Sequence, residues 1–227
     1  MISKIILALF GSYFILKPFY FWESGLPQIS DLILITAIIL FVTNNKMKIC
    51  IFKGSKPYIA LNSVFVLYIL FINSVWALIL NGELSFYKVS MYYLFNFISL
   101  VAVISLSGQY SQRLYKLLYY TASVSTILQF IIILLNGGFS GNREMAFFNN
   151  PNQLGYHSVL TLALILFLSE EMDVNCLWFT TLIFLLTVLC LVSLSKAAII
   201  SFFGMLLFYL LLRIRSRMHV LKSGKMF

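Results

Sequence analysis

Long apolar runs alternate with short polar segments along almost the whole chain. A run such as residues 127–135 is continuously apolar, without the period of two of a membrane barrel strand, so it predicts a helix. A helix needs roughly 20 residues to cross a hydrocarbon core of about 30 Å. The runs predict an all-α fold, a transmembrane helical bundle of about eight spans, at about 2–16, 29–43, 58–80, 89–106, 114–135, 152–168, 176–192 and 197–212.

The composition agrees with a membrane protein. Of the 227 residues, 61% are hydrophobic and 10% are charged, whereas a typical globular domain is about 45–50% apolar and 25% charged. Without an internal repeat or long linker, residues 1–227 are predicted to form a single integral membrane domain. The basic, apolar start resembles a signal peptide, but no small-residue cleavage site precedes Lys17-Pro18-Phe19-Tyr20, which favours a retained anchor.

The positive charges predict the orientation of the bundle, because Lys and Arg in short loops favour the cytoplasm. With a cytoplasmic N-terminus and an even number of spans, the C-terminus is also cytoplasmic, and twelve of the 16 Lys and Arg residues are inside. The inner set is Lys4, Lys46, Lys48, Lys53, Lys56, Arg113, Lys116, Arg213, Arg215, Arg217, Lys222 and Lys225, and the outer set is Lys17, Lys88, Arg143 and Lys196. The net charge of +9 then reflects topology and attraction to anionic lipids, and no nucleic-acid partner is expected.

Familiar catalytic patterns are missing from the sequence. It has only two His residues, no zinc-ligand spacing and no phosphate-binding glycine loop, so neither a metal nor another cofactor is expected. The acidic residues Glu170, Glu171 and Asp173 fall in a predicted inner loop, where a solvated turn explains them.

The polar segment at residues 141–157 opens one of the predicted spans on the outer side. Asn149 or Asn150 can cap a helix whose first turn holds Pro151. Gln153, His157 and Thr161 follow at spacing i, i+4 and i+8, so they share one face. That face is expected to point into the bundle or an outward-open cavity. The alternative for His157 alone is an interior histidine with satisfied hydrogen bonds.

A second polar segment, Ser193-Leu194-Ser195-Lys196-Ala197-Ala198, interrupts the apolar run from Cys176 to Leu212. It predicts a tight hairpin between two short spans, with Ser195 as N-cap and Lys196 as the first residue of the last helix. A cation there opposes the helix dipole. Lys196 and Arg143, which precedes the other helix start, together predict an anion site. The alternative is that Lys196 reaches the headgroups and Arg143 pairs with Glu144.

These two segments resemble the O-antigen ligase and polymerase family of bacterial envelope enzymes. The shared pattern is Arg143, then Phe147-Phe148-Asn149-Asn150-Pro151-Asn152-Gln153-Leu154-Gly155, then Ser193-Leu194-Ser195-Lys196-Ala197-Ala198. The resemblance covers mainly residues 136–212. It implies transfer of glycan from undecaprenyl diphosphate at the outer face of the cytoplasmic (inner) membrane, without a metal or nucleotide sugar.

The resemblance also implies roles for individual residues. Arg143 and Lys196 would bind the diphosphate of the donor, although Lys196 stands where the family usually has Arg. The possible lining of the donor site is Asn150, Asn152, Gln153, His157, Ser193 and Ser195. Family members continue into a large external loop and further spans, so the chain is expected to be an amino-terminal portion or a short variant, and an inactive truncated membrane protein is one alternative.

The partners implied are a lipid-linked glycan donor, a glycan or lipid acceptor, membrane lipids and other polysaccharide-assembly proteins. Two other classes stay open. A polysaccharide or lipid-linked-oligosaccharide exporter would place ionisable groups near the bilayer midplane, often at broken helices related by a repeat. A non-catalytic membrane scaffold would tolerate changes at Arg143 and Lys196.

Overall fold

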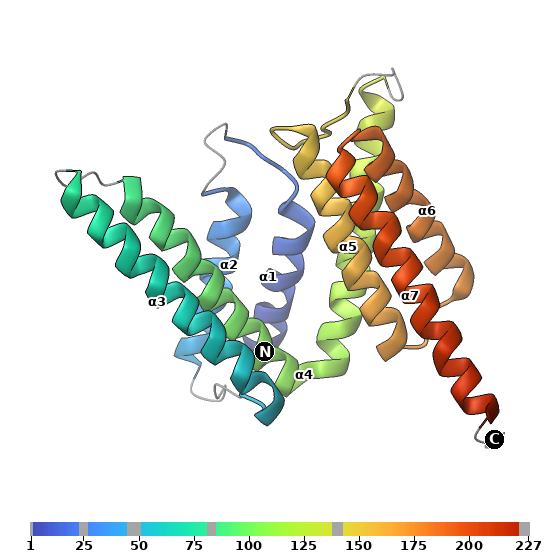
Figure 1. Cartoon of the computed structure of the whole chain (residues 1–227), viewed down its shortest axis with the longest axis horizontal. Helices are drawn as coiled ribbons and strands as arrows, with labels where there is room; N and C mark the ends of the chain where they lie inside the picture. The colour runs from blue at the N-terminus through green and yellow to red at the C-terminus, as the bar shows by residue number, and fades with distance from the viewer. Residues whose placement is uncertain (1, 23–26, 45–50, 81–84, 138–142, 223–227) are drawn as a thin grey trace. The chain divides into compact units, whose positions relative to one another are not determined.

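In a computed structural model, residues 2–22, 27–44, 51–80, 85–137 and 143–222 are described, and these are helical or irregular, without a strand. The helices, shown in Figure 1, are α1 (Ile2–Leu16), α2 (Ile29–Thr43), the short 3-10 helix η1 (Lys53–Ser55), α3 (Lys56–Ile79), α4 (Ser85–Leu135), α5 (Pro151–Glu171), α6 (Cys176–Val192) and α7 (Lys196–Lys222). The prediction of an all-α fold is confirmed for this part of the chain.

The helix bounds follow the apolar runs closely. α1, α2 and α6 cover the predicted segments 2–16, 29–43 and 176–192. α3 begins two residues before its predicted start, with Pro57 in its first turn, where a missing N–H is tolerated. α5 and α7 run beyond their apolar segments into the charged residues that follow.

α4 contains two of the predicted segments, 89–106 and 114–135, in one run of 51 helical residues. Tyr110 interrupts the helical conformation between them, with φ −136° and ψ 29°. Ser107 and Gly108 lie just before the break, and Gly and Ser weaken a helix at such points. The polar gap between the two apolar runs therefore becomes an irregular helical turn rather than a loop.

Four helices in the described part of the chain are long and apolar enough to cross a membrane: α3, α4, α5 and α7 up to Arg215. The apolar helices α1, α2 and α6 are shorter, at 15, 15 and 17 residues. The expected membrane character is thus supported by helix length and composition, whereas the count of eight spans stays a prediction.

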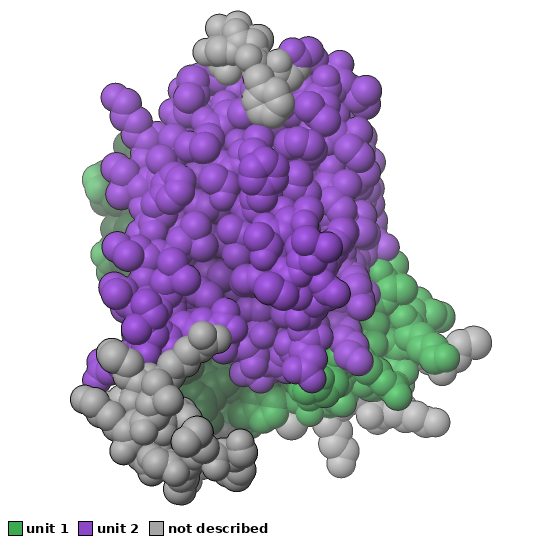
Figure 2. Space-filling view, turned by 90° about the vertical axis from the view of Figure 1, so that its right-hand side faces the viewer, with its two compact units in different colours: residues 1–10, 34–114 green, residues 11–33, 115–227 purple. Residues whose placement is uncertain are grey.

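The chain forms two compact units, coloured separately in Figure 2. Unit 1 comprises residues 1–10 and 34–114, and it includes an interhelical hydrogen bond of 2.9 Å from Asn73 Nδ2 on α3 to Ser90 Oγ on α4. Unit 2 comprises residues 11–33 and 115–227, so it contains both polar segments singled out by the sequence. Single-domain behaviour of residues 1–227 stays a prediction.

In unit 2, α5 packs against both α6 and α7, and the three helices lie side by side (Figure 1). Their buried residues are mostly apolar. Side chains with no exposed surface include Leu154, Leu162, Ile165, Leu168, Leu182, Leu186, Leu189 and Phe202. This core fixes the start of α5 relative to the turn between α6 and α7.

Candidate functional site

The first turn of α5 is capped by its own polar residues. The side chain of Asn150 accepts a hydrogen bond from the backbone N–H of Gln153 at 3.1 Å. The side-chain oxygen of Gln153 in turn accepts from the backbone N–H of Asn149 at 3.1 Å, a reciprocal arrangement close to a capping box. The predicted cap is confirmed for Asn150, with Pro151 in the first turn.

The turn between α6 and α7 is built around the hydroxyl of Ser193. This hydroxyl donates to the carbonyl of Cys190 at 2.7 Å and accepts from the backbone N–H of Ser195 at 3.2 Å. Leu194 adopts φ 49°, a left-handed conformation that costs an L-residue roughly 1–2 kcal/mol. α7 begins at Lys196, so the predicted hairpin and the position of Lys196 are confirmed.

Gly155 brings the two polar segments into direct contact. A β-carbon at this position would lie 2.8 Å from Cβ of Ala198, 2.8 Å from Oγ of Ser193 and 3.1 Å from Cβ of Ser195. Such distances leave no room for a side chain, and the approach requires glycine. The segments that the sequence separates by about 40 residues thus pack against each other at one end of unit 2.

Arg143 ties the same two segments together through its guanidinium group. Its Nε donates to the carbonyl of Ser193 at 3.3 Å, and one terminal nitrogen donates to the side-chain oxygen of Asn152 at 2.7 Å. The neighbouring backbone N–H of Glu144 donates to the carbonyl of Val192 at 3.0 Å. A guanidinium has five N–H donors, so these two bonds position Arg143 while leaving donors for an anion.

Lys196 is exposed at the start of α7, three residues after the carbonyl that Arg143 contacts. Its ammonium adds to a helix end that already carries roughly half a positive charge. Neither cation is buried, so both are accessible to an anion from solution or from a lipid headgroup. The diphosphate-binding role predicted for Arg143 and Lys196 stays a prediction.

His157 lies one turn deeper on α5. Its ring centroid is 5.3 Å from that of Phe148, and its Nε2 is 3.5 Å from Oγ1 of Thr161. His157 and Gln153 are half-buried and Thr161 is buried. The shared polar face predicted for these residues therefore packs within unit 2.

Sequence reasoning missed a buried ionic cluster where α1 leads into α2. Lys17 Nζ and Asp31 Oδ1 are 2.8 Å apart, and only 4% of the Asp31 side chain is exposed. Asp31 Oδ2 accepts from the backbone N–H of Gln28 at 2.9 Å. Gln28, fully buried, bonds the backbone of Phe21 and Trp22. The sequence signal that could have revealed this cluster is Asp31, an acidic residue in the first turn of an otherwise apolar helix.

The cluster holds a loop that packs on the approach to α5. The backbone N–H of Tyr20 donates to the carbonyl of Phe147 at 3.2 Å, and the rings of Tyr20 and Phe148 are 5.7 Å apart. Burial, and then the negative charge of Asp31, raise the pKa of Tyr20. Tyr20 therefore packs on Phe148 as a neutral phenol. The ring of Phe148 also contacts the ring of His157.

Among the described residues, no group of three or more His, Cys, Asp and Glu side chains is arranged to hold a metal ion. No family model, no curated protein and no solved structure matches the chain.

Proposed function

We propose that the chain is a multi-pass protein of the bacterial cytoplasmic membrane with about eight spans and both termini in the cytoplasm. The length of α4 supports the count, because a continuous helix of 51 residues would measure about 77 Å, well beyond the hydrocarbon thickness of about 30 Å. The interruption at Tyr110 divides it into two segments of spanning length. The excess of inner Lys and Arg supports the orientation.

Within that topology, the proposed activity is glycan transfer from undecaprenyl diphosphate, as in O-antigen polymerases or ligases. The observation that carries the proposal is the joining of two distant polar segments by Arg143 and Gly155. This packing produces two helix N-termini and two accessible cations at one end of unit 2. Backbone N–H groups at helix starts and Arg side chains both favour phosphate oxygens.

The proposed reaction replaces one bond to the anomeric carbon of the donor glycan. An acceptor hydroxyl oxygen bonds to that carbon, its proton passes to a base, and the carbon–oxygen bond to the diphosphate breaks. Undecaprenyl diphosphate leaves with the electron pair of the broken bond. Arg143 and Lys196 would stabilise the negative charge that develops on this leaving group, and Gln153 and His157 would border the sugar.

A transfer assay tests this proposal. Purified protein in liposomes is given radiolabelled undecaprenyl-diphosphate oligosaccharide, and labelled glycan on an acceptor is separated from the donor. Arg143→Ala and Lys196→Ala are each expected to slow transfer by about tenfold to a hundredfold, the loss of one charge-assisted contact to the transition state. Lys88→Ala, which removes an exposed lysine from the first turn of α4, is the control. Equal transfer by all variants would contradict the proposal.

An exporter of the same lipid-linked glycan is a second candidate, favoured by the interior of the second half of α4. Ser125 and Gln129 are buried there, and their side-chain polar atoms make no hydrogen bond within the described chain. A transport path needs polar groups of this kind inside the membrane. Translocation of the labelled donor across liposomes without transfer to an acceptor, lost in Gln129→Leu and not in Arg143→Ala, would favour the exporter.

A further inference from the structure

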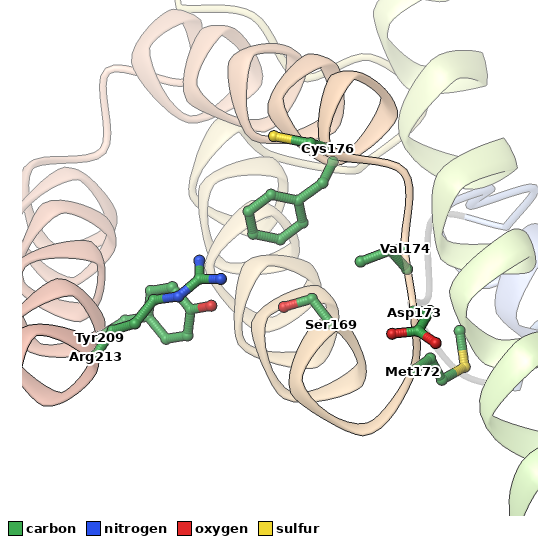
Figure 3. A pocket seen from close by; sticks show the side chains of 8 residues that line it. Ser169, Met172, Asp173, Val174, Cys176, Tyr209 and Arg213 are labelled. Atoms are coloured by element: carbon green, nitrogen blue, oxygen red, sulfur yellow. The ribbon is translucent and has the colours of Figure 1, made fainter. Parts of the chain in front are cut away.

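A polar cavity lies in unit 2 away from Arg143 and Lys196, where the loop between α5 and α6 meets α7 (Figure 3). Its volume is about 260 Å³, far above the ~15 Å³ that a single water needs. Figure 3 shows Arg213 and Tyr209 of α7 pointing toward Ser169 of α5, with Asp173 on the opposite wall. The remaining lining is Met172, Val174, Cys176 and Phe179.

The charged side chains that line this cavity are Arg213 on α7 and Asp173 on the opposite wall. The Arg213 guanidinium lies 5.9 Å from the ring centroid of Tyr209. The Tyr209 hydroxyl donates to a carboxylate oxygen of Glu170, and Glu170, Leu212, Tyr209 and Arg213 line an adjoining hollow of about 250 Å³. A ligand that enters here meets one cation on α7 and carboxylates from the end of α5 and the loop that follows.

With α7 as a membrane span, the length of this helix puts the cavity at the depth of lipid headgroups. Arg213 is 17 residues after Lys196 on one helix, or about 26 Å along its axis, close to the hydrocarbon thickness of about 30 Å. Tyr209 lines the cavity, and the exposed Trp178 follows the lining residue Cys176 by two positions in the first turn of α6, as is typical of aromatic residues at membrane interfaces. Leu212, which lines the adjoining hollow, is about half-exposed and offers apolar surface to an acyl chain.

We propose that this cavity binds the phosphoethanolamine headgroup of a membrane lipid. The phosphate would accept hydrogen bonds from Arg213, and the primary ammonium would donate to Asp173 and Glu170. A purely anionic headgroup would place its charge beside these carboxylates, which disfavours it. A phosphocholine headgroup lacks the N–H donors that the carboxylates require. This site does not depend on the proposed glycan transfer.

A lipid titration tests the assignment. The thermal unfolding midpoint of the whole chain in detergent micelles is followed as phosphatidylethanolamine, phosphatidylglycerol or phosphatidylcholine is added. Phosphatidylethanolamine is expected to raise the midpoint at the lowest concentration. Arg213→Gln and Asp173→Asn are each expected to weaken its apparent affinity about tenfold or more, as expected for a lost charge-assisted hydrogen bond.

Arg215→Gln is the matched control, because Arg215 is exposed on the same helix and does not line the cavity. It is expected to leave the affinity unchanged. Soluble O-phosphoethanolamine at equal concentration is expected to give no shift, since the acyl chains add membrane-derived affinity. Equal shifts with all three lipids, an equal shift with the soluble headgroup, or full affinity in both Arg213→Gln and Asp173→Asn would each overturn the proposal.

Discussion

At the scale of single residues, the candidate site depends on one position that has no room for a side chain and on one long side chain with several donors. Gly155 allows the start of α5 to touch Ser193 and Ala198. Arg143 then bonds the carbonyl of Ser193 and the side chain of Asn152 from outside. Gly155 and Arg143 together hold the two polar segments in contact, Gly155 because it has no side chain and Arg143 because it has several hydrogen-bond donors.

Gly155→Ala is expected to destabilise the protein by about 1–3 kcal/mol, because the added methyl group overpacks the contact with α7. Gly204→Ala provides the control, since a β-carbon at Gly204 meets nothing within 4 Å in the interior of α7. There the change should stabilise by roughly 0.5–1 kcal/mol through helix propensity. Chemical unfolding in detergent micelles measures both. Equal effects of the two substitutions would mean that the close approach at Gly155 is not present.

At the scale of elements, local sequence pattern predicted the helices better than the contacts between them. Apolar runs located α1, α2 and α6, and the Asn-Pro start located the cap of α5. These features depend on neighbouring residues, which a sequence displays directly. The two segments predicted within α4 lie on either side of Tyr110, where the backbone departs from helical geometry, so the break was located although it is a kink and not a loop.

Contacts between distant residues were harder to predict. The pair Lys17–Asp31 was missed because Lys17 follows the end of α1 whereas Asp31 lies in the first turn of α2, 14 residues later in the sequence. Considered without its partner, Lys17 reads as an ordinary loop lysine on the outer side. Similarly, the sequence indicated that Arg143 and Ser193 belong to one type of site, but their hydrogen bond depends on how α5, α6 and α7 pack.

The Lys17–Asp31 pair is expected to stabilise the loop between α1 and α2. In a double-mutant cycle with Lys17→Met and Asp31→Asn, unfolding free energies should reveal a coupling of about 1–3 kcal/mol, since Asp31 is almost fully buried. A cycle of Lys17→Met with Gly204→Ala, far along α7, should be additive within about 0.5 kcal/mol. Additivity in both cycles would show that the ion pair does not stabilise the fold.

At the scale of the whole molecule, the charge distribution along the sequence can be compared with the grouping of helix ends within unit 2. Arg143 and Ser193 lie at the same end of unit 2, and both belong to segments that charge counting assigns to the exterior. Arg213 and Glu170, which come close at the other cavity, belong to segments assigned to the cytoplasm. Spatial grouping within unit 2 and the positive-inside rule therefore agree.

Reporter fusions measure this topology directly. Fusions after residues 53, 113 and 222 are expected to report the cytoplasm, and a fusion after residue 143 is expected to report the exterior, because the inner segments carry most of the Lys and Arg residues. An exterior signal at 53 together with a cytoplasmic signal at 143 would reverse the orientation and place the candidate site on the wrong side for a lipid-linked donor.

The binding of undecaprenyl diphosphate, the proposed leaving group, tests the central claim most directly. Its dissociation constant is measured on purified protein in micelles for the wild type, Arg143→Ala, Lys196→Ala, Lys196→Arg and Lys88→Ala. A diphosphate site predicts about tenfold or greater weakening for each of the first two variants, with little change for Lys196→Arg and Lys88→Ala. Wild-type affinity in an Arg143→Ala, Lys196→Ala double variant would contradict the account.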